Sequence, residues 1–88
     1  MIKLEQFEKV VENALKDYYS GPYTNTLTAE QAGLDSLDLV EMVMACEEKL
    51  SFDFKCSVEI PDEAIEDFSI LLPISGQLPA ILAKTKAY

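Results

Sequence analysis

The residue of this sequence with the clearest chemical potential is Ser36, which follows Asp35 at the start of a long stretch without proline. Asp35 is suited to cap a helix, and Asp38 can reach back to a free backbone N–H in a variant of the capping box. The sequence therefore predicts a helix that begins at Ser36 or Leu37 and carries the Ser36 hydroxyl in its exposed first turn. A serine at a helix start is commonly only a cap. The same hydroxyl is also open to modification by a second enzyme, because helix N–H groups and the helix dipole would stabilise an attached anion.

This predicted helix, about residues 36–50, has two faces of different character at roughly 100° per residue. One face is apolar and should pack into the core. It carries Leu39, Met42, Val43, Cys46 and Leu50. The other face is apolar in the middle and acidic at its edges, which is typical of a docking surface. This acidic face carries Leu37, Val40 and Met44 with Asp35, Asp38, Glu41, Glu47 and Glu48.

The chain before Ser36 predicts one helix and a long loop. Apolar residues recur at helical spacing over residues 2–19, and a Gly-Pro pair should end that helix. Residues 23–34 then form a loop in which residues 28–31 match a capping box for one helical turn. Leu27 and Leu34 should anchor this loop to the core.

The segment that follows the central helix is harder to interpret. Residues 51–59 alternate between apolar and polar with period two, but no second strand is available and a lone strand is not stable. We therefore predict an irregular loop whose aromatic side chains plug the core. A short helix over residues 62–68 should follow, with Asp62 as its cap and with Ile65 and Phe68 facing inward.

The end of the chain predicts one more helix. Residues 69–76 contain a proline and should form a loop. The last helix should start near Leu78, because Pro79 suits the first helical position. Residues 1–88 are thus expected to form a single all-α domain, a small up-down-type bundle of three principal helices and one short helix with a long first loop.

The amino-acid composition narrows the range of possible functions. The 88 residues include 16 acidic and 7 basic side chains, for a formal net charge of −9. Such a charge argues against nucleic acid and anionic membranes and favours a basic protein partner. The chain has no histidine, so it has no Ser-His-Asp or Cys-His catalytic device and lacks the usual zinc ligands. We therefore expect a binding protein with no metal site, and not an enzyme.

Hydropathy and cysteine usage favour a cytoplasmic protein. No stretch approaches the ~18 consecutive apolar residues of a membrane span. The first residues are too charged for a signal peptide. Cys46 is predicted in the core and Cys56 in a loop, so we expect two free thiols and no disulfide.

Two stretches of the sequence resemble the acyl carrier proteins. The first, GLDSLDLVE at residues 33–41, resembles the site at which that family attaches phosphopantetheine. The second, IPDE at residues 60–63, resembles the loop into the family's third helix. The resemblance covers about residues 29–50 and 59–68. The family commonly has a leucine where this chain has Ala32.

The resemblance implies that Ser36 is joined by a phosphodiester bond to 4′-phosphopantetheine, which comes from coenzyme A. The arm would carry acyl intermediates as thioesters in fatty acid, polyketide or related lipid biosynthesis. Its partners would be a phosphopantetheinyl transferase and acyl-transfer or synthase enzymes with basic patches, which dock on the acidic face of a monomer. The bound acyl chain would fold back into an acyl pocket. That pocket is expected to contain Val43, Cys46, Ile60, Ile65 and Phe68.

Two alternatives stay open. The chain can be an aminoacyl or peptidyl carrier, although the strongly acidic helix favours the acyl class. It can also be an unmodified acidic protein-interaction module in which Ser36 is merely a cap. The acyl group, the pathway and the roles of residues 51–59 and 69–76 are not determined by the sequence.

Overall fold

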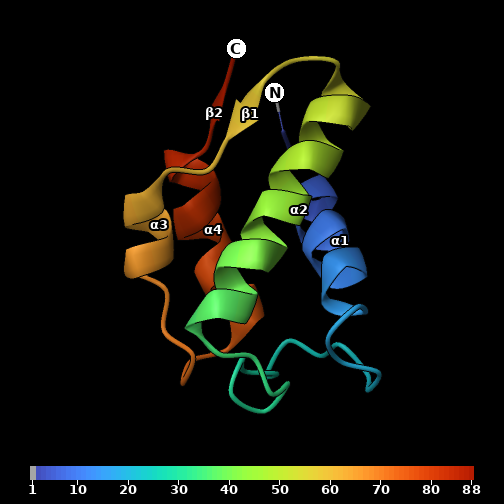
Figure 1. Cartoon of the computed structure of the whole chain (residues 1–88), viewed down its shortest axis with the longest axis vertical. Helices are drawn as coiled ribbons and strands as arrows, with labels where there is room; N and C mark the ends of the chain where they lie inside the picture. The colour runs from blue at the N-terminus through green and yellow to red at the C-terminus, as the bar shows by residue number, and fades with distance from the viewer. Residues whose placement is uncertain (1) are drawn as a thin grey trace.

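The computed structural model describes residues 2–88, and within them it contains four helices and a small antiparallel sheet of two strands (Figure 1). The elements in chain order are α1 (Leu4–Leu15), α2 (Ser36–Phe54), β1 (Val58–Glu59), α3 (Asp62–Glu66), α4 (Ile74–Lys84) and β2 (Lys86–Ala87). The expectation of a mostly helical chain is confirmed, and the sheet is an addition to it. None of the helices in residues 2–88 combines the length and the hydrophobicity that a membrane crossing requires.

The helices meet around one apolar core. α1 packs against α2 and α4, and the short α3 packs against both α2 and α4. The predicted core face of α2 is confirmed, because Leu39, Met42, Cys46 and Leu50 are buried, and Val43 is partly buried against the same core. Figure 1 shows the first turn of α2 at the opposite end of the molecule from β2. The start of α2, with Ser36, therefore lies far from the two-stranded sheet.

The region before α2 matches the prediction except at the end of α1. The expected helix over residues 2–19 stops at Leu15 as an α-helix, because the next residues form tighter turns in which the Tyr18 N–H donates to the Leu15 carbonyl at 2.9 Å. The predicted capping box of the first loop is confirmed. The Thr28 N–H donates to Gln31 Oε1, and the Gln31 N–H donates to Thr28 Oγ1, both at 3.0 Å.

The prediction for residues 51–59 is wrong in two respects. α2 continues to Phe54 and ends at Lys55, which adopts the left-handed conformation with φ of 53°. Nothing in this segment breaks a helix, and Lys49 supports the extra turn through an ion pair with Asp53 at 3.2 Å. Phe52 does not plug the core, because 78% of it is exposed to solvent, whereas Phe54 is partly buried and packs against the core as predicted.

A further error concerns strand pairing. Val58 pairs with Ala87 and Glu59 with Lys86 in β1 and β2. The partner strand comes from the last residues of the chain. A strand of two residues leaves no periodic signal, so only the folded chain reveals this pairing.

The last two helices also differ from the prediction. α3 ends at Glu66, and its N-cap is Pro61 and not Asp62. α4 starts at Ile74 with Pro73 as its N-cap, so Pro79 lies inside the helix. A proline within a helix removes one backbone hydrogen bond. The earlier start nevertheless buries Ile74 completely, which a start near residue 78 would forgo.

Candidate functional site

Ser36 is the first residue of α2, and its side chain is exposed. The predicted capping box at this point is confirmed. Asp35 Oδ1 accepts a hydrogen bond from the Asp38 N–H at 2.9 Å, and Asp38 Oδ2 accepts one from the Asp35 N–H at 3.2 Å. The Ser36 hydroxyl takes no part in this cap, so it stays available for chemistry without loss of the helix start.

A turn at Gly33 delivers the chain to this cap. Gly33 has a φ of +78°, a conformation that L side chains adopt only with strain. The turn is closed by the Leu34 N–H, which donates to the Ala29 carbonyl at 3.0 Å. Leu34 is thereby buried, as predicted, while the next two residues emerge at the surface. The positive φ of this turn thus explains why a glycine stands two residues before Asp35.

The first turn of α2 offers backbone donors beside the hydroxyl. The Asp38 N–H is occupied by the cap, and the Leu39 N–H donates to the Asp35 carbonyl at 3.0 Å. The N–H groups of Ser36 and Leu37 come earlier in the helix and have no intrahelical acceptor. Together with the positive end of the helix dipole, they favour a negative group attached to Ser36.

A surface groove starts at Ser36 and runs between α2 and α3. It encloses about 410 Å³. Its floor is apolar, whereas Asp62 and Glu66 bring carboxylates to the α3 side. The groove is lined by Ser36, Leu39, Val40, Asp62, Ile65, Glu66, Phe68 and Ile70. An arm attached to Ser36 would therefore lie over apolar side chains.

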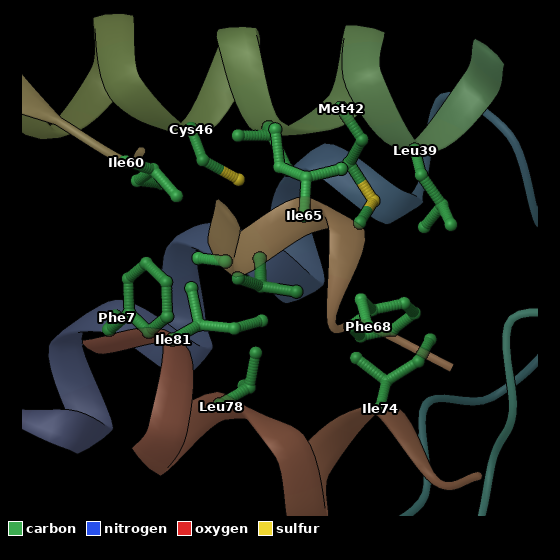
Figure 2. Close-up of a pocket in the computed structure, with 13 residues that line it drawn as sticks. Phe7, Leu39, Met42, Cys46, Ile60, Ile65, Phe68, Ile74, Leu78 and Ile81 are labelled. Carbon is green, nitrogen blue, oxygen red and sulfur yellow. The ribbon is translucent and has the colours of Figure 1, made fainter. Parts of the chain in front are cut away.

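An apolar cavity of about 30 Å³ lies behind this groove. Figure 2 shows side chains of α2 and α4 that point toward it from opposite sides, with Ile65 and Phe68 of the α3 region between them. Leu39, Ile65 and Phe68 line both the groove and the cavity, so these three side chains separate the two. The volume is about that of one water molecule, but a water here would lack polar partners.

The five residues expected in the acyl pocket, Val43, Cys46, Ile60, Ile65 and Phe68, all line this cavity. The expected pocket did not include the residues that α1 and α4 contribute to the cavity. These are Phe7, Val11, Ile74, Leu78 and Ile81. Of the α4 residues, Ile74 was missed because the helix start was placed too late, although the spacing of four and three residues from Ile74 to Leu78 and Ile81 is helical.

Cys46 behaves as an apolar side chain in this setting. Burial, with a smaller contribution from the negative charge of Glu47, raises the pKa of its thiol to about 12. The thiol therefore stays protonated at neutral pH, and a protonated thiol is a poor nucleophile. Both Cys46 and Cys56 are free, as predicted.

The acidic face of α2 exposes its apolar centre. Leu37, Val40 and Met44 are 65%, 39% and 58% exposed. Glu41 and Glu48 are exposed beside them.

Glu47, which was expected at the edge of this face, has another contact. It is half-buried, and its Oε2 accepts a hydrogen bond from the Ile60 N–H at 2.6 Å. This bond ties the segment between β1 and α3 to α2. The side chain is therefore engaged within the fold, in contrast to the exposed Glu41 and Glu48.

No family model matches the chain, and no solved structure matches it. Within residues 2–88, no three histidine, cysteine or acidic side chains gather as a metal site would need.

Proposed function

We propose that this chain carries acyl intermediates as thioesters on a 4′-phosphopantetheine arm attached to Ser36, in fatty acid, polyketide or related lipid biosynthesis. In this proposal the helices form the small up-down-type bundle of an acyl carrier protein. One observation carries it: the Gly-Leu-Asp-Ser-Leu sequence puts an exposed hydroxyl on the first residue of a capped helix, at the start of an apolar groove.

The residues around Ser36 fit such an arm. The hydroxyl is outside the capping box, and the backbone N–H groups of Ser36 and Leu37 can donate to a phosphodiester. Asp35 and Asp38 carry like charge, but their carboxylates accept hydrogen bonds from each other's backbone N–H. The chemistry supplied by the bound arm is a terminal thiol that forms thioesters. The protein's own contribution is to present that thiol and to shield what it carries.

Leu39, Ile65 and Phe68 are the side chains that an acyl tail has to displace. They separate the groove from the cavity, and the cavity of about 30 Å³ is too small for a tail without such movement. Apolar side chains permit this displacement because they lose no hydrogen bonds when they shift. The tail leaves water as it enters, and this burial stabilises the loaded state.

The acidic face is proposed as the docking surface for the transferase and for acyl-transfer or synthase enzymes. Leu37, Val40 and Met44 would supply the apolar contact, while Glu41 and Glu48 would attract basic groups of the partner. Glu47 is the least available member of the face, because it is bonded to Ile60.

The aminoacyl alternative is less well supported. An aminoacyl group carries a charged amine, which the apolar cavity does not compensate. The unmodified interaction module uses the same acidic face but requires no chemistry at Ser36. Intact mass separates this third possibility from the carriers.

The test is to incubate the full chain with coenzyme A, Mg²⁺ and a broad-range phosphopantetheinyl transferase. The wild type should gain the mass of one phosphopantetheine, and Ser36→Ala should gain none. Ser57→Ala is the matched control, because Ser57 is also exposed but follows Cys56 and not an aspartate. Circular dichroism verifies that each variant is folded. Modification of Ser36→Ala, or an unmodified wild type, would refute the proposal.

A further inference from the structure

Two neighbouring leucines form an exposed apolar surface beside the Ser36 groove. Leu71 and Leu72 are 65% and 55% exposed. They follow directly on Ile70, which lines the groove together with Ser36. Figure 1 shows the segment between α3 and α4 at the same end of the molecule as the first turn of α2. Whatever approaches Ser36 along the groove therefore also approaches these leucines.

The segment that carries the leucines is fixed on both sides. The Ile70 carbonyl accepts a hydrogen bond from the Glu30 N–H at 3.0 Å. The Ile74 N–H donates to the Leu27 carbonyl at 2.9 Å, and Pro73 forms a bridge with Thr28. Both attachments join it to the loop that precedes Gly33. The leucines thus sit on a stretch whose ends are held by the loop that positions Ser36.

Gln77 of α4 holds the same segment from within. Its Oε1 accepts from the Ser69 N–H at 2.7 Å, and its Nε2 donates to the Ser69 carbonyl at 2.8 Å and to the Leu72 carbonyl at 3.2 Å. Exposed leucines on such a constrained segment lose less conformational entropy on binding than they would on a free loop. The two leucines therefore form a preorganised binding surface.

The charge of the surface around the leucines indicates which kind of partner would bind there. Residues 17–48 and 56–83, which include α3 and the lining of the groove, contain acidic residues and no lysine or arginine. Asp62 and Glu66 stand on the α3 side of the groove. A surface of this sign repels anionic lipid and a second copy of itself, and it attracts a protein surface that is basic around an apolar depression.

We propose that Leu71 and Leu72 form a second docking element, which inserts into an apolar depression rimmed by lysine or arginine on the enzymes that act at Ser36. This inference rests on the proposed function, because those enzymes are the proteins that must reach the hydroxyl and its arm. The partner then contacts the carrier on both sides of Ser36: on the acidic face of α2 and at the two leucines.

The test uses the transferase as the partner and measures steady-state transfer from coenzyme A to the full chain. Leu71→Ser/Leu72→Ser should lower kcat/KM at least ten-fold through KM, equivalent to about 1.4 kcal/mol. Leu71→Met/Leu72→Met keeps the apolar surface and should stay within about two-fold of wild type. Phe52→Ser is the matched control, since Phe52 is 78% exposed but lies near the far end of α2. It should leave the rate unchanged.

The outcomes separate this inference from the proposed function. A wild-type chain that the transferase never modifies refutes the proposed function and this inference with it. Normal kinetics of Leu71→Ser/Leu72→Ser refute only this inference, as does an equal loss in Phe52→Ser. Two other results would also refute this inference. One is a wild-type dimer, seen by light scattering, that is a monomer in Leu71→Ser/Leu72→Ser. The other is binding of phosphatidylcholine vesicles by the wild type but not by Leu71→Ser/Leu72→Ser.

Discussion

The stability of the proposed carrier, once loaded, should rise with the length of the attached acyl chain. The perturbation is a series of saturated thioesters, from acetyl to octanoyl, on the arm proposed at Ser36. If the tail enters between α2 and α3, each added methylene is withdrawn from water against Leu39, Ile65 and Phe68. If the tail stays in solvent, chain length has no effect on the folded state.

The size of the effect follows from the cavity. Each buried methylene contributes about 0.8 kcal/mol, and 1 kcal/mol shifts the melting temperature of a domain of this size by about 4–8 °C. The upper limit is therefore about 3–6 °C per methylene. The existing cavity of about 30 Å³ admits only the first carbons without rearrangement. Later carbons must move side chains, so we expect increments below this limit and a plateau.

The assay is thermal unfolding of each homogeneous species, with loading verified by intact mass. Ala64→Leu supplies the control, because Ala64 is buried and lines the cavity. The larger side chain fills the space that the tail would use, at a cost of about 1–3 kcal/mol in its own stability. Its melting temperature should then depend only weakly on chain length. Equal melting temperatures for acetyl and octanoyl wild type, or an unchanged slope in Ala64→Leu, would refute the reasoning.

Four further predictions concern the same end of the molecule and its core. Asp35→Ala should lower the free energy of unfolding by about 0.5–2 kcal/mol in urea titrations, whereas Ser36→Ala should change it by less, because only the aspartate forms the cap. Native protein should react with a maleimide at Cys56 and not at the buried Cys46. Since the pKa of Cys46 is raised to about 12 from 9.0, the unfolded chain releases this proton first, so stability should fall as pH rises through that interval. Glu41→Lys should slow association with the transferase and weaken the salt dependence of the rate, and an unchanged rate would mean that the acidic face is only solvated.

The parts of the site that depend on local sequence were predictable. The cap formed by Asp35 and Asp38 requires only a spacing of three residues, and it fixes the start of α2. The core face of α2 follows from helical periodicity over the same residues. Both were therefore visible in the sequence, and so was the exposed place of Ser36.

The parts that depend on distant residues were not predictable. Val58 and Glu59 become a strand only because Ala87 and Lys86 are brought beside them. The start of α4 was misplaced because a local rule about Pro79 competed with the burial of Ile74, and burial prevailed. The same error left Ile74 out of the expected cavity wall. Local signals located Ser36 at the start of α2, and tertiary packing determined what lies behind it.

The two walls of the groove are held with different strength, and this difference suits a carrier. α2 is a helix of 19 residues with a capped start and buried side chains along its length. α3 has 5 residues, and Ala64 is the one among them that is buried. An exposed ion pair between Asp67 and Lys84 at 2.7 Å helps to hold its end, and such pairs contribute only about 0–1 kcal/mol. In the proposed carrier, Ser36 thus stays fixed on the stable wall, while the α3 wall yields to admit the acyl chain.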